Sequence, residues 1–103
     1  MSILGTALPA AQTLVTLYQV PAGRRAVVNV AACNRGPLAS TLRLALSSTT
    51  TPVDSEYIEF DVSLAPSEVL ERTALSLAAG QKVLVQADSD HISFNTWGIE
   101  EVA

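Results

Sequence analysis

Residues 16–29, TLYQVPAGRRAVVN, and residues 73–86, TALSLAAGQKVLVQ, carry the same pattern at a constant offset of 57 positions. Each stretch is an apolar run, a turn that contains Ala-Gly, a polar or basic pair, and a second apolar run that ends in an amide side chain. Glycine supplies the positive φ that a tight reversal needs, so each copy is typical of a β-hairpin or a β-arch. Two copies in 103 residues predict a small sandwich with approximate internal two-fold symmetry.

Alternating apolar and polar residues predict more strands around this repeat. The cleanest alternation lies in residues 57–64, where Ile58, Phe60, Val62 and Leu64 are expected to point inward and Glu59 and Asp61 to stand on the wet face. After Pro66 a short helix is an alternative, but no Glu or Gln follows Ser67 at the third position, which favours a strand over residues 69–77. Seven or eight short strands predict an all-β fold, a small antiparallel β-sandwich or jelly roll.

We divide the chain into an extended N-terminal arm, residues 1–12, and a single β-sandwich domain, residues 13–103. The first segment contains Gly5 and Pro9 and shows no sustained period. An uncharged arm can add a strand to a neighbour's sheet edge, so we expect it to reach across a subunit boundary. It lacks the basic region of a signal peptide, and no run of 18 apolar residues predicts a membrane span.

Composition indicates self-association. Charged residues make up 16% of the chain, against about 25% in a typical soluble domain, while hydrophobic residues make up 49%. A small domain with so little charge is expected to have part of its surface covered by partners, which predicts a homo-oligomer, a trimer or a higher ring. The net charge is −4 and the six basic residues are scattered, so neither nucleic acid nor a membrane is an expected partner.

The reactive side chains form no motif that predicts catalysis. His91 follows Asp88-Ser89-Asp90, so a dyad acting on Ser89 or Cys33 is conceivable, but no nucleophile motif accompanies it. The same acidic turn lacks the further ligands of an EF-hand, and the single cysteine, Cys33, is expected to be a buried small apolar residue at a strand end. We therefore expect no enzyme, and no catalytic, cofactor-binding or metal residues.

Three further groups of side chains are candidates for a site. Glu56, Glu59 and Asp61 form an acidic stretch, but a glycosidase needs two carboxylates across a cleft. Trp97 is expected to be a core plug or a subunit contact rather than a sugar platform. Arg43 is expected to meet Glu59 or Asp61 across the sheet, and Arg72 lies among Glu68 and Glu71 in the sequence; such pairs set register or docking.

Taken in order, several segments resemble short accessory structural proteins of tailed-bacteriophage virions. They are LYQVPAGRRAVV over 17–28, CNR over 33–35, RLAL over 43–46, YIEF over 57–60, VLERT over 69–73, LAAG over 77–80 and GIE over 98–100. The resemblance covers residues 14–101 and implies a non-enzymatic β-sandwich that multimerises with itself and with other virion proteins. It implies a location in the virion, assembled in the bacterial host cytoplasm, with capsid decoration favoured over neck or tail and baseplate.

Two alternatives remain open. One is a receptor- or carbohydrate-binding module of a phage fibre, which should expose Tyr18, Tyr57 or Trp97 in a concave patch with polar neighbours. The other is a small hydrolase, which requires His91 in a pocket within reach of a nucleophile.

Overall fold

The structure is a computed structural model that describes residues 2–103. Eight β-strands and one short 3₁₀ helix, η1 (Asp54–Glu56), follow one another along the chain. The strands are β1 (Ser2–Ala7), β2 (Val15–Gln19), β3 (Arg24–Asn34), β4 (Ser40–Ser47), β5 (Tyr57–Leu64), β6 (Val69–Leu77), β7 (Lys82–Ala87) and β8 (Ile92–Val102). The all-β prediction is confirmed, and residues 69–77 form a strand, not a helix.

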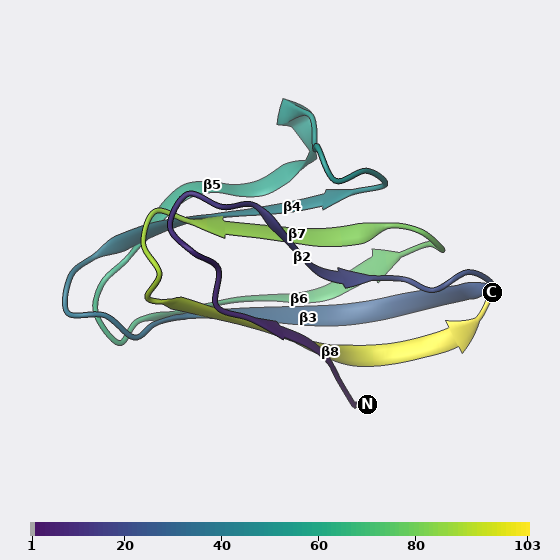
Figure 1. The fold of residues 1–103 in the computed structure, drawn as a ribbon. Coiled ribbons are helices and arrows are strands. Elements are labelled where there is room, and N and C mark those ends of the chain that lie inside the picture. The colour runs from purple at the N-terminus through teal and green to yellow at the C-terminus, as the bar shows by residue number, and fades with distance from the viewer. Residues whose placement is uncertain (1) are drawn as a thin grey trace.

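The strands form two four-stranded antiparallel sheets that pack face to face (Figure 1). The first sheet has the order β1-β8-β3-β6 and the second has the order β2-β7-β4-β5. Apart from β4 and β5, neighbours in each sheet are not consecutive in the chain, which passes back and forth between the layers. This strand order is that of an eight-stranded jelly roll, in which two Greek keys are wound together.

The repeated stretches form two arches that cross between the sheets. In the first, β2 belongs to the second sheet and β3 to the first; in the second, β6 belongs to the first sheet and β7 to the second. The reversals use Gly23 at φ 75° and Gly80 at φ 83°, as the Ala-Gly turns predict. The arches lie against each other, because β2 pairs with β7 and β3 pairs with β6. The repeat is therefore an arch, not a hairpin, and it packs on its own copy.

The core lies between the two sheets and is built from alternate residues of each strand. In β3 the inward residues Ala26, Val28, Val30 and Ala32 are at most 3% exposed. Phe94 of β8 and Leu42 of β4 are the largest apolar side chains that are fully buried. Burial of a side chain of this size contributes about 1.5–3 kcal/mol.

A β-bulge in β5 overturns part of the expected alternation. Leu42 pairs with Val62, but the next residue of β4, Arg43, pairs with Phe60, so Asp61 is the extra residue and adopts φ 54°. The insertion reverses Phe60 and Glu59, and a second register shift between Leu44 and Ala45 leaves Ile58 packed against the core, as expected. Phe60, expected inside, is 56% exposed, and Glu59, expected on the wet face, is half-buried. Of the two acidic residues expected on the wet face, only Asp61 lies there.

Residues 2–7, assigned from the sequence to an extended arm, are extended but pair with β8 of the same chain as strand β1. Gly5 permits this position, because a Cβ there would lie 2.3 Å from the Leu17 carbonyl oxygen of β2. In this chain the segment therefore completes the first sheet of its own sandwich, while Met1 lies outside the described residues.

Candidate functional site

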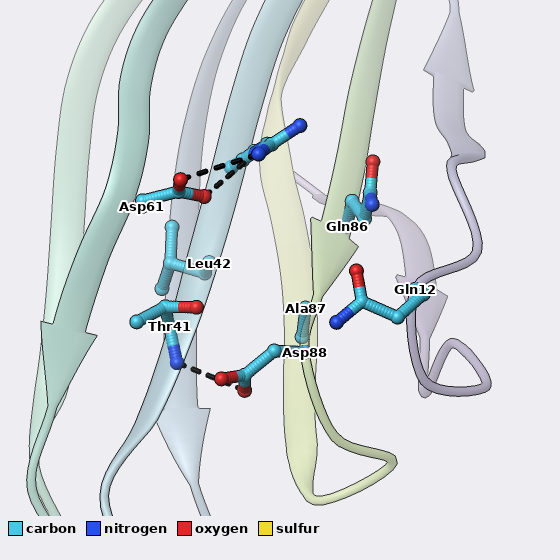
Figure 2. A pocket seen from close by; sticks show the side chains of 8 residues that line it. Gln12, Thr41, Leu42, Asp61, Gln86, Ala87 and Asp88 are labelled. Carbon is cyan, nitrogen blue, oxygen red and sulfur yellow. Dashed lines mark hydrogen bonds and ion pairs between the residues drawn. The ribbon is translucent and has the colours of Figure 1, made fainter.

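A polar hollow of about 270 Å³ lies on the second sheet, where β4, β5 and β7 run side by side. Figure 2 shows Asp61 and Asp88 at its two ends and Gln12 and Gln86 along one side. The backbone amide of Gln12 donates to the Ala87 carbonyl at 2.8 Å, which anchors the loop before β2 against the end of β7. The hollow therefore combines two carboxylates with two amide side chains from distant segments.

Arg43 closes one end of the hollow. Its Nε donates to Asp61 Oδ1 at 2.7 Å and its Nη2 donates to Asp61 Oδ2 at 3.2 Å, a two-point pair across β4 and β5. The guanidinium carbon lies 4.0 Å from the centre of the Phe60 ring. The hydrogen bond from Arg43 lowers the pKa of Asp61, and the same bond raises the pKa of Arg43. The prediction that Arg43 meets an acidic residue of β5 is confirmed for Asp61.

Asp88 at the other end is held by the first residues of β4. The Ser40 hydroxyl donates to Asp88 Oδ1, and the Thr41 backbone amide donates to the same oxygen at 3.0 Å. These bonds, that of Ser40 first, lower the pKa of Asp88. Both carboxylates of the hollow are therefore ionised at neutral pH and already bonded to donors of the chain. The hollow can hydrogen-bond a polar ligand through Gln12 and Gln86, but its carboxylates are not poised to donate protons.

His91 lies at the surface beside the turn that precedes β8. Its Nε2 is 3.6 Å from Asp90 Oδ1, and its side chain is 53% exposed. The ring packs against Gly36, where a Cβ would come within 2.7 Å of it. Ser89, the nearest candidate nucleophile in the sequence, uses its hydroxyl to bond the Ser40 hydroxyl at 2.7 Å and to accept the His91 backbone amide at 3.3 Å. The structure thus engages Ser89 in the turn itself.

Cys33 lies elsewhere, on the outer face of β3. It is partly exposed and pairs with Ser93 of β8 and Val69 of β6. Its place near a strand end is confirmed, but the expectation that it is buried is wrong, because the side chain is on the outward side of β3.

The acidic stretch is divided among three environments. Glu59 points between the sheets, where its carboxylate lies 3.5 Å from Arg72 Nε of β6. Glu56 accepts hydrogen bonds from the Ser47 hydroxyl and the Val53 amide, each at 2.9 Å. Since the bulge turns Glu59 and Asp61 to opposite sides, the expectation that they share one face is wrong. Arg72, expected among Glu68 and Glu71, instead joins the two sheets.

The three candidate aromatic residues do not line the polar hollow. Tyr18 is 8% exposed, and its hydroxyl donates to Glu100 Oε2 at 2.5 Å. Burial, with the hydrogen bond to Glu100 as a second cause, raises the pKa of Tyr18. Tyr57 is half-buried with its ring edge-on to Phe60, 5.2 Å between ring centres, and Trp97 is half-buried on the outer face of β8.

Within residues 2–103, the structure brings together no group of three or more His, Cys, Asp or Glu side chains that could hold a metal ion. In the same part of the chain, no helix is long and apolar enough to cross a bilayer.

The outer face of the first sheet is the second candidate surface. Four of the chain's exposed large apolar side chains lie there: Ile3 (75% exposed), Val27 (45%), Val69 (52%) and Ile99 (44%). Trp97 lies among them, opposite Ile3 on β1 and Asn29 on β3. A shallow hollow of about 470 Å³ runs beside Val27 and Ile99. A face of this kind is typical of a protein–protein contact.

Sequence reasoning missed two of these features. The polar hollow depends on Gln12, which no periodic pattern marks, and on Gln86, which is recognisable only as an outward position of β7 once the register is known. The outer apolar face was indicated in general by the low charge, but its residues come from four strands that are not consecutive. Comparisons of the chain with protein-family models, with curated proteins and with solved structures gave no match.

Proposed function

We propose that this chain is a non-enzymatic structural protein of a tailed-phage particle, which multimerises and decorates or stabilises the virion. The observation that carries the proposal is the outer face of the first sheet, where Ile3, Val27, Val69 and Ile99 are exposed beside Trp97. Soluble monomers rarely expose contiguous apolar patches, so this face is suited to contact with other protein.

Two further arguments support a virion role. The ordered segments of residues 14–101 resemble accessory virion proteins of tailed phages. Jelly rolls are also common in viral capsid domains, although lectins and cupins share the architecture, so the fold supports the proposal only by analogy. Capsid decoration is preferred to a neck or tail location, and the partners are other copies of the chain and other virion proteins.

Electron microscopy of purified particles, combined with mass spectrometry of their proteins, tests the proposal. The expected result is that the chain is present in stoichiometric amounts and that its jelly roll fits density on the capsid exterior. Particles that lack the chain, isolated from cells that express it, would refute a structural role in the virion.

The second candidate is a receptor- or carbohydrate-binding module of a phage fibre. The polar hollow favours it, because Gln12 and Gln86 offer amide donors and acceptors and the exposed Phe60 lies next to Arg43 at one end. Against it, Tyr18 is buried, and neither Tyr57 nor Trp97 lines the hollow. Titration with oligosaccharides, followed by amide NMR shifts, would support this function if the Gln12 and Gln86 signals moved together and their alanine variants did not bind.

A further inference from the structure

The outer face of the first sheet is laid out in rows by its two central strands. β3 and β8 pair without a register shift over their whole length. Successive outward rows place Arg25 beside Glu101, Val27 beside Ile99 and Asn29 beside Trp97. The first two of these rows contain a pair of opposite charge and a pair of aliphatic side chains, with one member on each central strand.

This layout is complementary to itself. If the face is turned so that β3 and β8 exchange places, Arg25 takes the position of Glu101 and Glu101 takes that of Arg25. Val27 and Ile99 exchange positions in the same way. The exchange is what a two-fold axis produces when it runs parallel to the strands, between β3 and β8, with two sheets face to face.

We propose that two copies of this chain pack first sheet against first sheet about such an axis, each β3 lying over β8 of the other copy. Arg25 then meets Glu101 of the partner subunit, and Glu101 meets the partner's Arg25. Val27 packs on the partner's Ile99 in the same way. Because Arg25 and Glu101 are also paired within one chain at 3.2 Å, the dimer contains a ring of four alternating charges.

The other isologous arrangement does not match the charges. A two-fold axis across the strands at the row of Asn29 would place Arg25 over the partner's Cys33 and would place Glu101 over the partner's Ser93. These charges would lose water without gaining an opposite charge, which costs binding energy. Charge complementarity thus selects the axis parallel to the strands.

Growth at the sheet edges is disfavoured by the structure of the edge strands. The pairings of β1, β2, β5 and β6 with their inner neighbours each contain a register shift, whereas the pairings β3–β8 and β4–β7 contain none. In β6 the irregularity leaves Ala74 at φ 58°, with its amide donating to Asn29 Oδ1 at 3.1 Å. Bulges twist an edge away from a new strand, so an incoming copy is directed to the face.

The area of the face is at the lower end of what a stable dimer needs. Its four strands contain 6, 11, 11 and 9 residues, and at about 3.3 Å per residue and about 4.8 Å per strand they project about 590 Å² per copy. Two copies then bury about 1,200 Å², at the lower end of the range of specific interfaces, about 1,200–2,000 Å². An isologous contact closes at two copies, so the dimer takes the place of the trimer or ring expected from composition. The inference rests on the proposed self-association and specifies its geometry.

Charge reversal provides the test. In a dimer of the Arg25→Glu variant, all four side chains of this row are acidic. In a dimer of the Glu101→Arg variant, all four are basic. Each variant alone is expected to raise the dimer dissociation constant at least tenfold in sedimentation equilibrium, because like charges face each other. In an equimolar mixture, the two acidic side chains that the Arg25→Glu copy carries in this row face the two basic side chains of the Glu101→Arg copy. A mixed dimer is therefore expected to form with restored affinity.

Controls separate the interface from other effects. The ion pair between residues 25 and 101 of one chain is broken in both variants and stays broken on mixing. A recovery of dimer affinity in the mixture therefore reports only contacts between copies. Arg24→Glu makes the same change of charge one residue away, on the opposite side of β3, and is expected to leave dimerisation unchanged. Circular dichroism of every variant verifies that the β-fold is retained.

Three results would overturn the inference, each in a distinct way. A chain that stays monomeric at millimolar concentration has no such dimer, and the virion role is then judged by particle composition alone. A chain that self-associates with affinity insensitive to Arg25→Glu and Glu101→Arg uses another surface, and its self-association stands. If the variants weaken the dimer but do not recover on mixing, the face is involved but the two-fold register is incorrect.

Discussion

Replacement of Asn34 by alanine is the most demanding test of how the fold is held together. Asn34 ends β3 and is 0% exposed. Its Nδ2 donates to the carbonyls of Leu38 and Leu64, each at 2.9 Å, and its Oδ1 accepts the Gly36 amide at 2.9 Å. One side chain therefore ties the loop after β3, the approach to β4 and the end of β5.

The expected loss follows from the groups that alanine would leave without partners. A buried polar group that loses its hydrogen bond costs about 1–3 kcal/mol. The Leu64 carbonyl and the Gly36 amide are bonded in the buried interior, while the bond to Leu38 is only partly buried and water can replace it. We therefore expect Asn34→Ala to reduce the free energy of unfolding by about 2–6 kcal/mol, about 1–3 kcal/mol for each of the two buried groups. A domain of this size has about 5–15 kcal/mol in total, so the variant should be marginally stable.

Urea denaturation followed by circular dichroism measures this loss at neutral pH. Gln19→Ala is the matched control, since Gln19 is an exposed amide side chain on β2 of the second sheet, and a change within about 0.5 kcal/mol is expected there. If Asn34→Ala does not fold, Asn34→Asp provides a second measurement. Its carboxylate would face two carbonyl oxygens, so its pKa in the folded chain should lie above the ordinary value. That variant should be most stable at low pH and should lose stability as the pH rises through the raised pKa. A loss below about 1 kcal/mol for Asn34→Ala would refute the reasoning.

Three other perturbations test separate parts of the structure. Gly98→Ala would place a methyl group 2.1 Å from the Val27 carbonyl oxygen and 2.8 Å from Val28 Cα, so β3 and β8 must separate. We expect the free energy of unfolding to fall by about 2–3 kcal/mol in the same denaturation assay. A near-neutral result would contradict the close approach of the two strands. Tyr18 has a raised pKa in the folded chain, so its contribution is complete below the ordinary tyrosine pKa and is lost as the pH rises above it. Tyr18→Phe should therefore show a smaller loss of stability between pH 9 and pH 12 than the parent chain, and equal alkaline losses would exclude Tyr18 as their source. Asp88 has a lowered pKa because of Ser40, so its contribution is present above the ordinary aspartate pKa and is lost as the pH falls. Ser40→Ala should raise the Asp88 pKa in a carboxyl NMR titration, and an unchanged pKa would show that the Ser40 hydrogen bond is not its main cause.

Local signals in the sequence were sufficient for the elements of the fold. Strand alternation has a period of two residues and is visible within a short segment, so the strands on either side of the two turns were recognisable from residues 16–29 and 73–86. The reversals at Gly23 and Gly80 were recognisable because a positive φ strongly favours glycine. The choice of strand over helix for residues 69–77 also followed from local capping chemistry.

The bulge in β5 shows where local reasoning ends. Residues 57–64 alternate cleanly, yet Asp61 is inserted and reverses Phe60 and Glu59. The reversal becomes understandable only across the sandwich, because it brings Glu59 to Arg72 and leaves Asp61 and Phe60 on the two sides of Arg43. These partners come from β4 and β6, and no spacing within β5 indicates them.

The sequence by itself determined that this chain is an all-β protein and where its arches turn, because these depend on backbone dihedrals and side-chain alternation within a few residues. Only the tertiary structure decided that β1 completes the first sheet, that the two arches pair with each other, and that Arg25 and Glu101 share a row on an apolar face. The physical reason is that strand order and register are set by hydrogen bonds and packing between segments far apart in the chain, where a shift of one residue reverses every side chain.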